Sequence, residues 1–176
     1  MRVIGGYLKG RKIAPPRNLP VRPTTDLARE SLFNILSNVF DLSSVRVLDL
    51  FSGTGIVSLE FASRGCADIV SVDLHPGCTA FLKESTQKLQ IGCIRVHRAD
   101  AFRFIQKPQA GFDIIFADPP YDHPGVKSLP DIVFAGQILN KEGWLIVEHS
   151  SRLLFGDHPH FFQHRSYGDV NFSIMK

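Results

Sequence analysis

Apolar and polar positions along the chain predict strands and helices in alternation. A first amphipathic helix is expected to begin near Thr24 and Thr25, either of which can cap it, with Asp26 in its first turn. Short apolar runs and stretches of helical periodicity then follow one another. The expected strands are 45–51, 69–73, 93–97, 112–117, 144–148, 161–166 and 171–175, and the expected later helices are 56–64, 77–89, 101–106 and 128–139.

This alternation indicates a parallel sheet that is covered by helices on both faces. We expect an α/β, doubly wound, mostly parallel, seven-stranded Rossmann-like sheet whose last two strands, 161–166 and 171–175, form an antiparallel pair. Ligands of such sheets bind beyond the carboxyl ends of the strands, near the point where the strand order reverses. The residues that follow each strand are therefore the candidates for chemistry.

Four consecutive expected strands end in or near an aspartate: Asp49, Asp73, Asp100 and Asp118. The first of them opens a loop with the sequence DLFSGTG, 49–55, whose glycines permit a tight turn and a close approach of backbone to a ligand. Any one of these aspartates could be a helix cap or a turn residue. Their recurrence at four strand ends favours a shared binding site.

The glycine loop allows two interpretations. Gly53 and Gly55 match the start of the dinucleotide-binding fingerprint, but Ser58 stands where the third glycine would be. A cofactor with a free amino group and a positive sulfonium suits an aspartate at the head of the loop better, and S-adenosylmethionine is such a cofactor. In this hypothesis Asp49 holds the methionine end, Asp73 binds the ribose hydroxyls and Asp100 accepts from the adenine amino group.

The sequence Asp118-Pro119-Pro120-Tyr121 carries the most specific signal. Its two prolines stiffen the loop and have no N–H, so that its carbonyls are available as acceptors. The Asp118 carboxylate and the Pro119 carbonyl can bind the two hydrogens of an exocyclic amine and turn its lone pair toward a methyl group. Tyr121 offers a face on which an unpaired or flipped-out base can stack. The segment predicts methyl transfer to a nucleobase amine.

Charge is uneven along the chain. The net charge is +3, yet residues 1–22 contain six of the 20 Lys and Arg residues and no acid. A basic segment on a slightly acidic body indicates a polyanionic partner. Because apolar residues and glycines separate these cations, we expect a short ordered β-hairpin, followed by a proline-rich connector.

Composition excludes several classes of protein. Hydrophobic residues make up 44% and charged residues 21%, as in ordinary globular domains. No apolar run approaches the roughly 20 residues of a membrane span, and the start lacks the apolar stretch of a secretory signal, so we expect a cytoplasmic protein without membrane contact. The three cysteines lack CxxC spacing, and we expect neither disulfides nor a metal. The absence of a second apolar helix face favours a monomer.

Three segments resemble known enzymes. DLFSGTG at 49–55, Asp73 within SVDLHP and DPPY at 118–121 resemble class I S-adenosylmethionine-dependent amino-methyltransferases. VIGGYLKGRKIAPP at 3–16 and RPTTDLARESLFNIL at 22–36 are more narrowly similar to the RsmD family, bacterial methyltransferases that act on guanine N2 in 16S ribosomal RNA. The resemblance implies the methyltransferase version of the fold, S-adenosylmethionine as cofactor, and 16S rRNA within an assembling small ribosomal subunit as substrate.

The resemblance and the strand-end pattern together give the candidate residues. The catalytic candidates are Asp118, Pro119, Pro120 and Tyr121. The cofactor-binding candidates are Asp49, Phe51, Ser52, Gly53, Gly55, Asp73, Leu74, Asp100 and Ala101. The RNA-binding candidates are Arg2, Lys9, Arg11, Lys12, Arg22 and Thr24. The chain is accordingly divided into a basic RNA-facing hairpin and connector, 1–23, and a methyltransferase domain, 24–176.

Other functions remain open at this point. A DPPY loop also resembles enzymes that methylate adenine N6 in RNA or DNA, because both bases offer an exocyclic amine to the same acceptors. Protein-glutamine methyltransferases resemble the pattern too, but carry asparagine where this chain has Asp118. A non-catalytic RNA-binding assembly factor is a further alternative, against which the intact sequence 118–121 argues.

Overall fold

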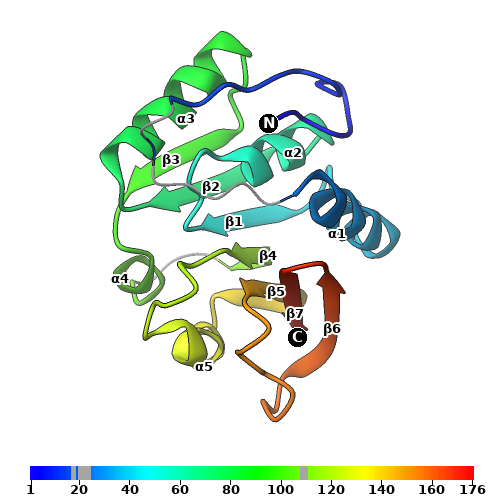
Figure 1. The fold of residues 1–176 in the computed structure, drawn as a ribbon, viewed down its shortest axis with the longest axis vertical. Helices are drawn as coiled ribbons and strands as arrows, with labels where there is room; N and C mark the ends of the chain where they lie inside the picture. The colour runs from blue at the N-terminus through cyan, green and yellow to red at the C-terminus, as the bar shows by residue number, and fades with distance from the viewer. Residues whose placement is uncertain (17–18, 20–24, 108–110) are drawn as a thin grey trace.

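The protein is described from a computed structural model, which covers residues 1–16, 19, 25–107 and 111–176. Within these ranges one sheet has the strand order β3-β2-β1-β4-β5-β7-β6, from the top to the bottom of Figure 1. The strands are β1 (Arg46–Leu50), β2 (Asp68–Asp73), β3 (Ile94–Arg98), β4 (Phe112–Ala117), β5 (Leu139–His149), β6 (Phe161–Tyr167) and β7 (Val170–Met175). The pairs among β1 to β5 are parallel, whereas β7 pairs antiparallel with both β5 and β6. The fold is therefore Rossmann-like α/β with a mixed sheet.

Helices cover both faces of the sheet. They are α1 (Asp26–Val39), α2 (Ile56–Ser63), α3 (Pro76–Lys88), α4 (Ala101–Ile105) and α5 (Leu129–Ala135), with a short 3₁₀ turn, η1 (Val126–Ser128), before the last. Neighbouring side chains of a strand point to opposite faces. In β4, Phe116 packs in the cluster that contains buried residues of α1, α2 and α3, while Ile115 packs in the cluster of α4 and α5.

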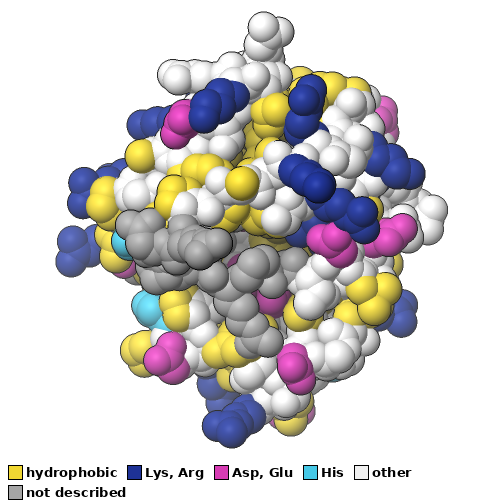
Figure 2. Space-filling view, turned by 45° about the horizontal axis from the view of Figure 1, so that its top comes forward, with side chains coloured by type: hydrophobic (Ala, Val, Ile, Leu, Met, Phe, Trp, Pro, Cys, Tyr) yellow, Lys and Arg dark blue, Asp and Glu magenta, His cyan; other side chains and the backbone are white. Residues whose placement is uncertain are grey.

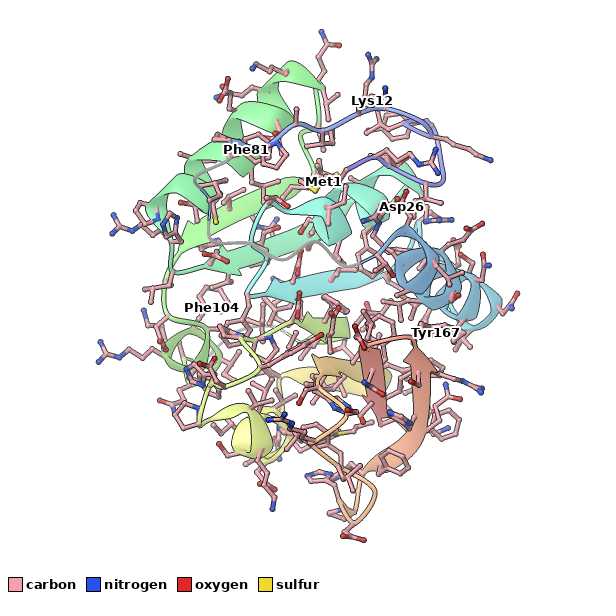
Figure 3. The ribbon with its side chains drawn as sticks, in the orientation of Figure 1. Met1, Lys12, Asp26, Phe81, Phe104 and Tyr167 are labelled. Atoms are coloured by element: carbon pink, nitrogen blue, oxygen red, sulfur yellow. The ribbon has the colours of Figure 1, made fainter. Side chains whose placement is uncertain are left out.

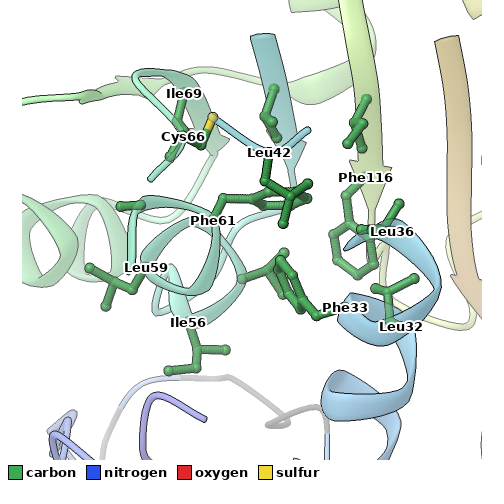
Figure 4. Packing of buried hydrophobic residues seen from close by; sticks show 14 of the residues in the cluster. Leu32, Phe33, Leu36, Leu42, Ile56, Leu59, Phe61, Cys66, Ile69 and Phe116 are labelled. Carbon is green, nitrogen blue, oxygen red and sulfur yellow. The ribbon is translucent and has the colours of Figure 1, made fainter. Parts of the chain in front are cut away.

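The first helix begins where the sequence predicts. Thr25 is its cap, and the Thr25 hydroxyl accepts a hydrogen bond of 3.2 Å from the backbone N–H of Ala28. Its buried face carries Leu32, Phe33 and Leu36; in Figure 4 Phe33 faces Phe61 of α2, and Leu36 lies beside Phe116 of β4. The rings of Phe33 and Phe61 meet edge to face, with 4.6 Å between their centroids. This ring contact packs α1 against α2, over the face of the sheet formed by β1 and β4.

The N-terminal segment, residues 1–16, differs from the hairpin that the sequence predicts. It contains a single antiparallel bridge, between Arg2 and Lys12, and no strand. Its two arms still pair through backbone hydrogen bonds, from the Val3 N–H to the Arg11 carbonyl over 3.0 Å and from the Ile13 N–H to the Met1 carbonyl over 2.9 Å. The residues between the arms bond to α2 instead, because Tyr7 donates to the Ser63 carbonyl over 2.8 Å and Leu8 donates to the Ser63 hydroxyl over 2.9 Å. The N-terminus accordingly lies beside α2 in Figure 1.

Two further element boundaries differ from expectation. The helix expected at 128–139 ends at Ala135, and β5 begins at Leu139 rather than 144. The early part of β5 carries an irregularity, since Phe112 pairs with Leu139 but Ile114 pairs with Trp144. Alternating apolar positions do not reveal such a bulge. Across the described residues no helix is long and apolar enough to cross a bilayer.

Candidate active site

A cavity of about 860 Å³ opens at the carboxyl ends of the central strands. β1 and β4 are neighbours there, and the strand order reverses between them, which is the usual ligand position in this kind of sheet. The structure brings together twelve sequence-predicted residues as its lining: Asp49, Phe51, Ser52, Gly53, Asp73, Leu74, Asp100, Ala101, Asp118, Pro119, Pro120 and Tyr121. Gly55, also predicted, lies in the same loop and is not part of the lining.

The loop after β1 has a backbone that few sequences can adopt. Phe51, Gly53 and Gly55 all have left-handed φ angles, of 58°, 53° and 75°. A Cβ added to Gly55 would come within 2.3 Å of the Leu82 side chain, so α3 packs against this glycine. Phe51 therefore leaves the strand that the sequence predicts it to extend. The left-handed turns expose backbone to the cavity.

Asp73 ties the glycine loop to the end of β2. Its Oδ2 accepts a hydrogen bond of 2.8 Å from the Gly53 N–H, and its Oδ1 accepts one of 2.7 Å from the His75 N–H. Each carboxylate oxygen has two acceptor positions, so Asp73 can still accept from a ligand. This geometry suits a pair of ribose hydroxyls.

Asp49 is buried at the head of the loop, with an exposed fraction of 1%. Its Oδ2 accepts hydrogen bonds from both the backbone N–H and the hydroxyl of Ser58, and that hydroxyl lies 2.6 Å from the Ser71 hydroxyl. Burial raises the pKa of Asp49 to about 7, against the opposing effect of the Ser58 hydrogen bonds. Ser58 is thus a partner of Asp49, which is why no glycine is needed there.

Asp100 and Leu74 lie at the outer part of the cavity. Asp100 caps α4, and its Oδ1 accepts a hydrogen bond of 2.8 Å from the Arg103 N–H. Leu74 is exposed and offers an apolar surface beside Asp73. A flat aromatic ligand can be covered by Leu74 while its polar edge faces Asp100.

The segment 118–121 continues directly from β4. The Asp118 N–H donates to the Leu50 carbonyl over 3.3 Å, which holds the segment beside the glycine loop. Pro119 is buried, whereas Pro120 is exposed. The Tyr121 hydroxyl donates to Oε1 of Glu148 over 3.4 Å. The expected amine acceptors and the expected stacking face therefore lie in the same cavity as the loop after β1.

Sequence reasoning missed several residues of the cavity. They are Thr54, Ile56, Val57, His75, Pro76, Cys78, Arg98, Phe116, His123 and Glu148. His123 stacks on Phe102, with centroids 4.9 Å apart and planes 16° apart, and so packs the segment that follows β4 against α4. Its position two residues after Tyr121 was the only available signal. Glu148 has a clearer sequence signal, because it ends an apolar strand as the four aspartates do.

The RNA-binding candidates that the structure describes, Arg2, Lys9, Arg11 and Lys12, are not part of the cavity lining. Lys9, Arg11 and Lys12 are exposed around a second hollow, of about 600 Å³, in the N-terminal segment. Lys12 lies on the outer side of this segment in Figure 3, and Figure 2 shows Lys and Arg side chains spread over the upper part and the edges of the molecule. Arg2 differs, because its Nε forms an ion pair of 2.9 Å with Asp26. The candidates Arg22 and Thr24 lie outside the described residues.

A buried ion cluster holds the N-terminal segment. Glu60 and Arg29 are both fully buried, and the Arg29 Nε lies 3.7 Å from a Glu60 oxygen. Glu60 also accepts from the N–H groups of Ile4 and Gly5, and Arg64 lies 3.5 Å from its other oxygen. Val3, Leu8 and Ile13 join the core beneath. The basic segment is therefore anchored at its base and exposed at its tip.

Among the residues that the structure describes, no group of three or more His, Cys, Asp or Glu side chains is arranged to hold a metal ion.

Comparison with known proteins identifies the family. The family described as "Conserved hypothetical protein 95" matches residues 1–176. The chain belongs to this family. It is 36% identical to the Bacillus subtilis protein YlbH over 153 residues, which covers 85% of this chain and 82% of that protein. It is 32% identical to "Ribosomal RNA small subunit methyltransferase D" of Escherichia coli over 148 residues, 84% of this chain and 71% of that protein.

The same relationship is visible in three dimensions. The solved structure of the Escherichia coli protein yhhF superposes with a TM-score of 0.87 at 28% identity, covering 99% of this chain and 96% of that one. The RsmD-type resemblance that the sequence predicts is thus confirmed, and with it membership in a family of rRNA methyltransferases.

Proposed function

We propose that this protein transfers a methyl group from S-adenosylmethionine to the exocyclic N2 amine of a guanine in 16S rRNA of the small ribosomal subunit. The observation that carries the proposal is the meeting, in one cavity, of the glycine loop with Asp49 and Asp73 and of the segment 118–121. A relative with 32% identity over 84% of the chain is named as a small-subunit rRNA methyltransferase. We further propose that the protein acts as a cytoplasmic monomer without a metal.

The cavity fits the cofactor. The buried Ser52 hydroxyl has no hydrogen-bond partner among the described residues, although it lies in the glycine loop and lines the cavity. A buried polar atom of this kind is normally satisfied, and a ligand with polar groups would satisfy it. The carboxylate of Asp49 suits a cationic amino group, and the spare acceptor positions of Asp73 suit ribose hydroxyls.

When bound, S-adenosylmethionine would supply a methyl group already activated by its positive sulfonium: the C–S bond would break as the new N–C bond forms, with the electron pair left on sulfur. The protein has mainly to position the acceptor, which can contribute roughly 7–11 kcal/mol to lowering the barrier. Asp118 and the Pro119 carbonyl accept the two amine hydrogens and aim the nitrogen lone pair. After transfer the amine is positively charged and acidic, so its extra proton passes to Asp118 or to water.

The N-terminal segment is proposed to bind the RNA backbone. Lys9, Arg11 and Lys12 are exposed at its tip, while its base is fixed by Glu60 on α2. Cations on a fixed support can bind phosphates with little loss of conformational entropy. The candidates Arg22 and Thr24 are proposed as RNA contacts on the basis of the resemblance alone.

The experiment that tests the proposal separates cofactor binding from transfer. Asp118→Ala should leave the calorimetric affinity for S-adenosylmethionine nearly unchanged, because Asp118 binds the acceptor amine. Methyl transfer to small ribosomal subunits should fall at least about 100-fold, as when another preorganised polar partner of a reacting group is removed. Equal turnover of variant and wild type would contradict the catalytic role. Failure of the wild type to bind S-adenosylmethionine would instead favour a non-catalytic assembly factor.

A further inference from the structure

Glu148 is a carboxylate of the cavity that neither the cofactor nor the amine acceptors account for. It is the second-last residue of β5 and is buried, with an exposed fraction of 3%, yet it lines the cavity. Burying a carboxylate is costly unless it has partners of suitable chemistry. Glu148 has partners in the protein, among them the Tyr121 hydroxyl, and its position beside the segment 118–121 makes it a candidate for contact with the substrate.

The sheet register places Glu148 on the same side as Asp49. Asp49 pairs with Phe116 of β4, and Phe116 pairs with Ile146 of β5, so these three side chains share one face. Glu148 follows Ile146 by two residues and therefore points to that face as well. Three neighbouring strands thus direct acidic side chains, Asp49, Asp118 and Glu148, to one cavity.

A contact with Tyr121 fixes Glu148 relative to the base that the proposed function puts there. The Tyr121 hydroxyl donates to Oε1 of Glu148 over 3.4 Å. A base stacked on the Tyr121 ring would have one edge near this carboxylate. With the amine of the same base held by Asp118 and Pro119, Glu148 would face one of the two ring positions next to that amine, N1 or N3 in guanine, and only N1 can donate to a carboxylate.

The chemistry of that edge decides what Glu148 can recognise. In guanine the ring nitrogen N1 carries a hydrogen and lies beside the N2 amine, so both groups are donors. In adenine the ring nitrogen N1 beside the N6 amine is an acceptor. A carboxylate is acceptor-only, so it complements guanine and opposes adenine.

We propose that Glu148 accepts a hydrogen bond from N1–H of the target guanine and thereby selects guanine over adenine. The inference rests on the proposed function and adds a specificity-determining residue to it. Adenine would leave the buried carboxylate facing a lone pair, and sites built to hydrogen-bond a substrate group reject analogues that lack it.

The test is a double-mutant cycle, in which one change replaces the Glu148 side chain and the other removes the hydrogen on N1 of the base. Wild-type protein and Glu148→Gln are given small subunits reconstituted with 16S rRNA that carries guanine or 2-aminopurine at the nucleotide that the wild type methylates. 2-Aminopurine keeps the N2 amine but has no hydrogen on N1. For the wild type, kcat/KM should fall at least about 100-fold on this replacement. For Glu148→Gln, the same replacement should cost less than about 10-fold.

Equal losses for the two proteins would overturn the inference, because Glu148 and N1–H would then act independently. Methylation of adenine by the wild type would overturn the proposed function together with the inference. Normal guanine methylation combined with equal losses would overturn the inference alone.

Two further variants separate recognition of the base from a general loss of structure. Glu142→Gln removes an exposed carboxylate from the same strand and should change neither rate. Tyr121→Phe removes only the hydroxyl that donates to Glu148, and should reduce the discrimination against 2-aminopurine while S-adenosylmethionine affinity stays unchanged. If Tyr121→Phe and Glu148→Gln both discriminated against 2-aminopurine as fully as the wild type does, the proposal would be contradicted, even if one variant were less stable.

Discussion

The backbone N–H of Gly53 donates a hydrogen bond to Oδ2 of Asp73 over 2.8 Å, and so joins the loop after β1 to the end of β2. The other oxygen of the same carboxylate holds the His75 N–H. Asp73 therefore shapes the cofactor loop before any ligand is bound. A preorganised loop loses less conformational entropy on binding.

Replacing Asp73 should weaken cofactor binding in two ways, by loosening the loop after β1 and by removing a hydrogen-bond acceptor for the ligand. Asp73→Ala removes the acceptor for two backbone donors and, in the proposed function, for the ribose hydroxyls, so the Kd for S-adenosylmethionine should rise by about 10- to 100-fold. Isothermal titration calorimetry measures the effect. Asp157→Ala, which removes an exposed acid outside the cavity lining, is the matched control and should bind normally. Unchanged affinity in Asp73→Ala would exclude the ribose role.

Cofactor affinity should depend on pH through Asp49. Burial raises the pKa of Asp49 to about 7, so the carboxylate is ionised above that pH and neutral below it. Because a cationic ligand favours the ionised form, the affinity should fall by up to about tenfold per pH unit below pH 7. Titrations from pH 8 to pH 5.5 measure this slope. Asp49→Asn should bind weakly at every pH, and a flat wild-type profile would contradict the assignment.

Ionisation of the Asp49 carboxyl should lower the free energy of unfolding as the pH rises. The folded pKa of Asp49 lies above its ordinary value of 3.8, so its contribution to stability is complete below pH 3.8 and is lost as pH rises through about 7. Asp49→Asn avoids this loss. Without cofactor, the Tm of Asp49→Asn should exceed that of the wild type at pH 8, by a margin that shrinks toward pH 4. A margin independent of pH would show that ionisation of Asp49 is not its cause.

The buried ion cluster should be essential to the N-terminal segment. Glu60→Gln removes the buried negative charge beside Arg29 and Arg64, while Arg29 keeps its 2.8 Å ion pair with Asp26, so the free energy of unfolding should fall by about 1–3 kcal/mol. Denaturant unfolding measures the loss, and hydrogen exchange should show faster exchange at residues 4–8. Glu84→Gln breaks the exposed pair with Lys88 and should cost less than about 1 kcal/mol. Similar losses in the two variants would contradict the anchoring role.

The exposed cations of the segment should determine the salt dependence of RNA binding. Replacing Lys9, Arg11 and Lys12 by alanine should weaken binding to small subunits and reduce the slope of log K against log salt by about 2–3. The charge-matched control replaces three exposed cations of other elements, Lys107, Lys141 and Arg165. If both triple variants changed the slope equally, net charge rather than the segment would be responsible.

The strands and the central site could be predicted because their signals are local. β4 has its predicted bounds, and each of the four strand-end aspartates reaches the cavity because parallel strands bring their carboxyl ends to one edge. Glu148 was missed because a single acid after an apolar strand has no accompanying motif. Its meaning appears only when the register of β4 and β5 is known.

The arrangement of the N-terminal segment depends on contacts that sequence pattern does not contain. Val3 and Leu8 were recognised as apolar positions between cations, but their burial against α2 depends on Glu60 and Ser63, more than 50 residues away. Ser58 was interpreted as a mismatch to a glycine fingerprint, whereas its hydroxyl is bonded to Asp49. In both cases hydrogen bonds between separate segments, across 55 residues for Leu8 and nine for Ser58, determine what the local pattern does not show.

The most direct test of the central claim is methyl transfer from labelled S-adenosylmethionine to small ribosomal subunits isolated from cells that lack this protein, followed by nucleoside mass analysis. The account predicts label in N2-methylguanosine, and loss of that label with Asp118→Ala. Label in N6-methyladenosine, or no label while the cofactor still binds, would contradict it.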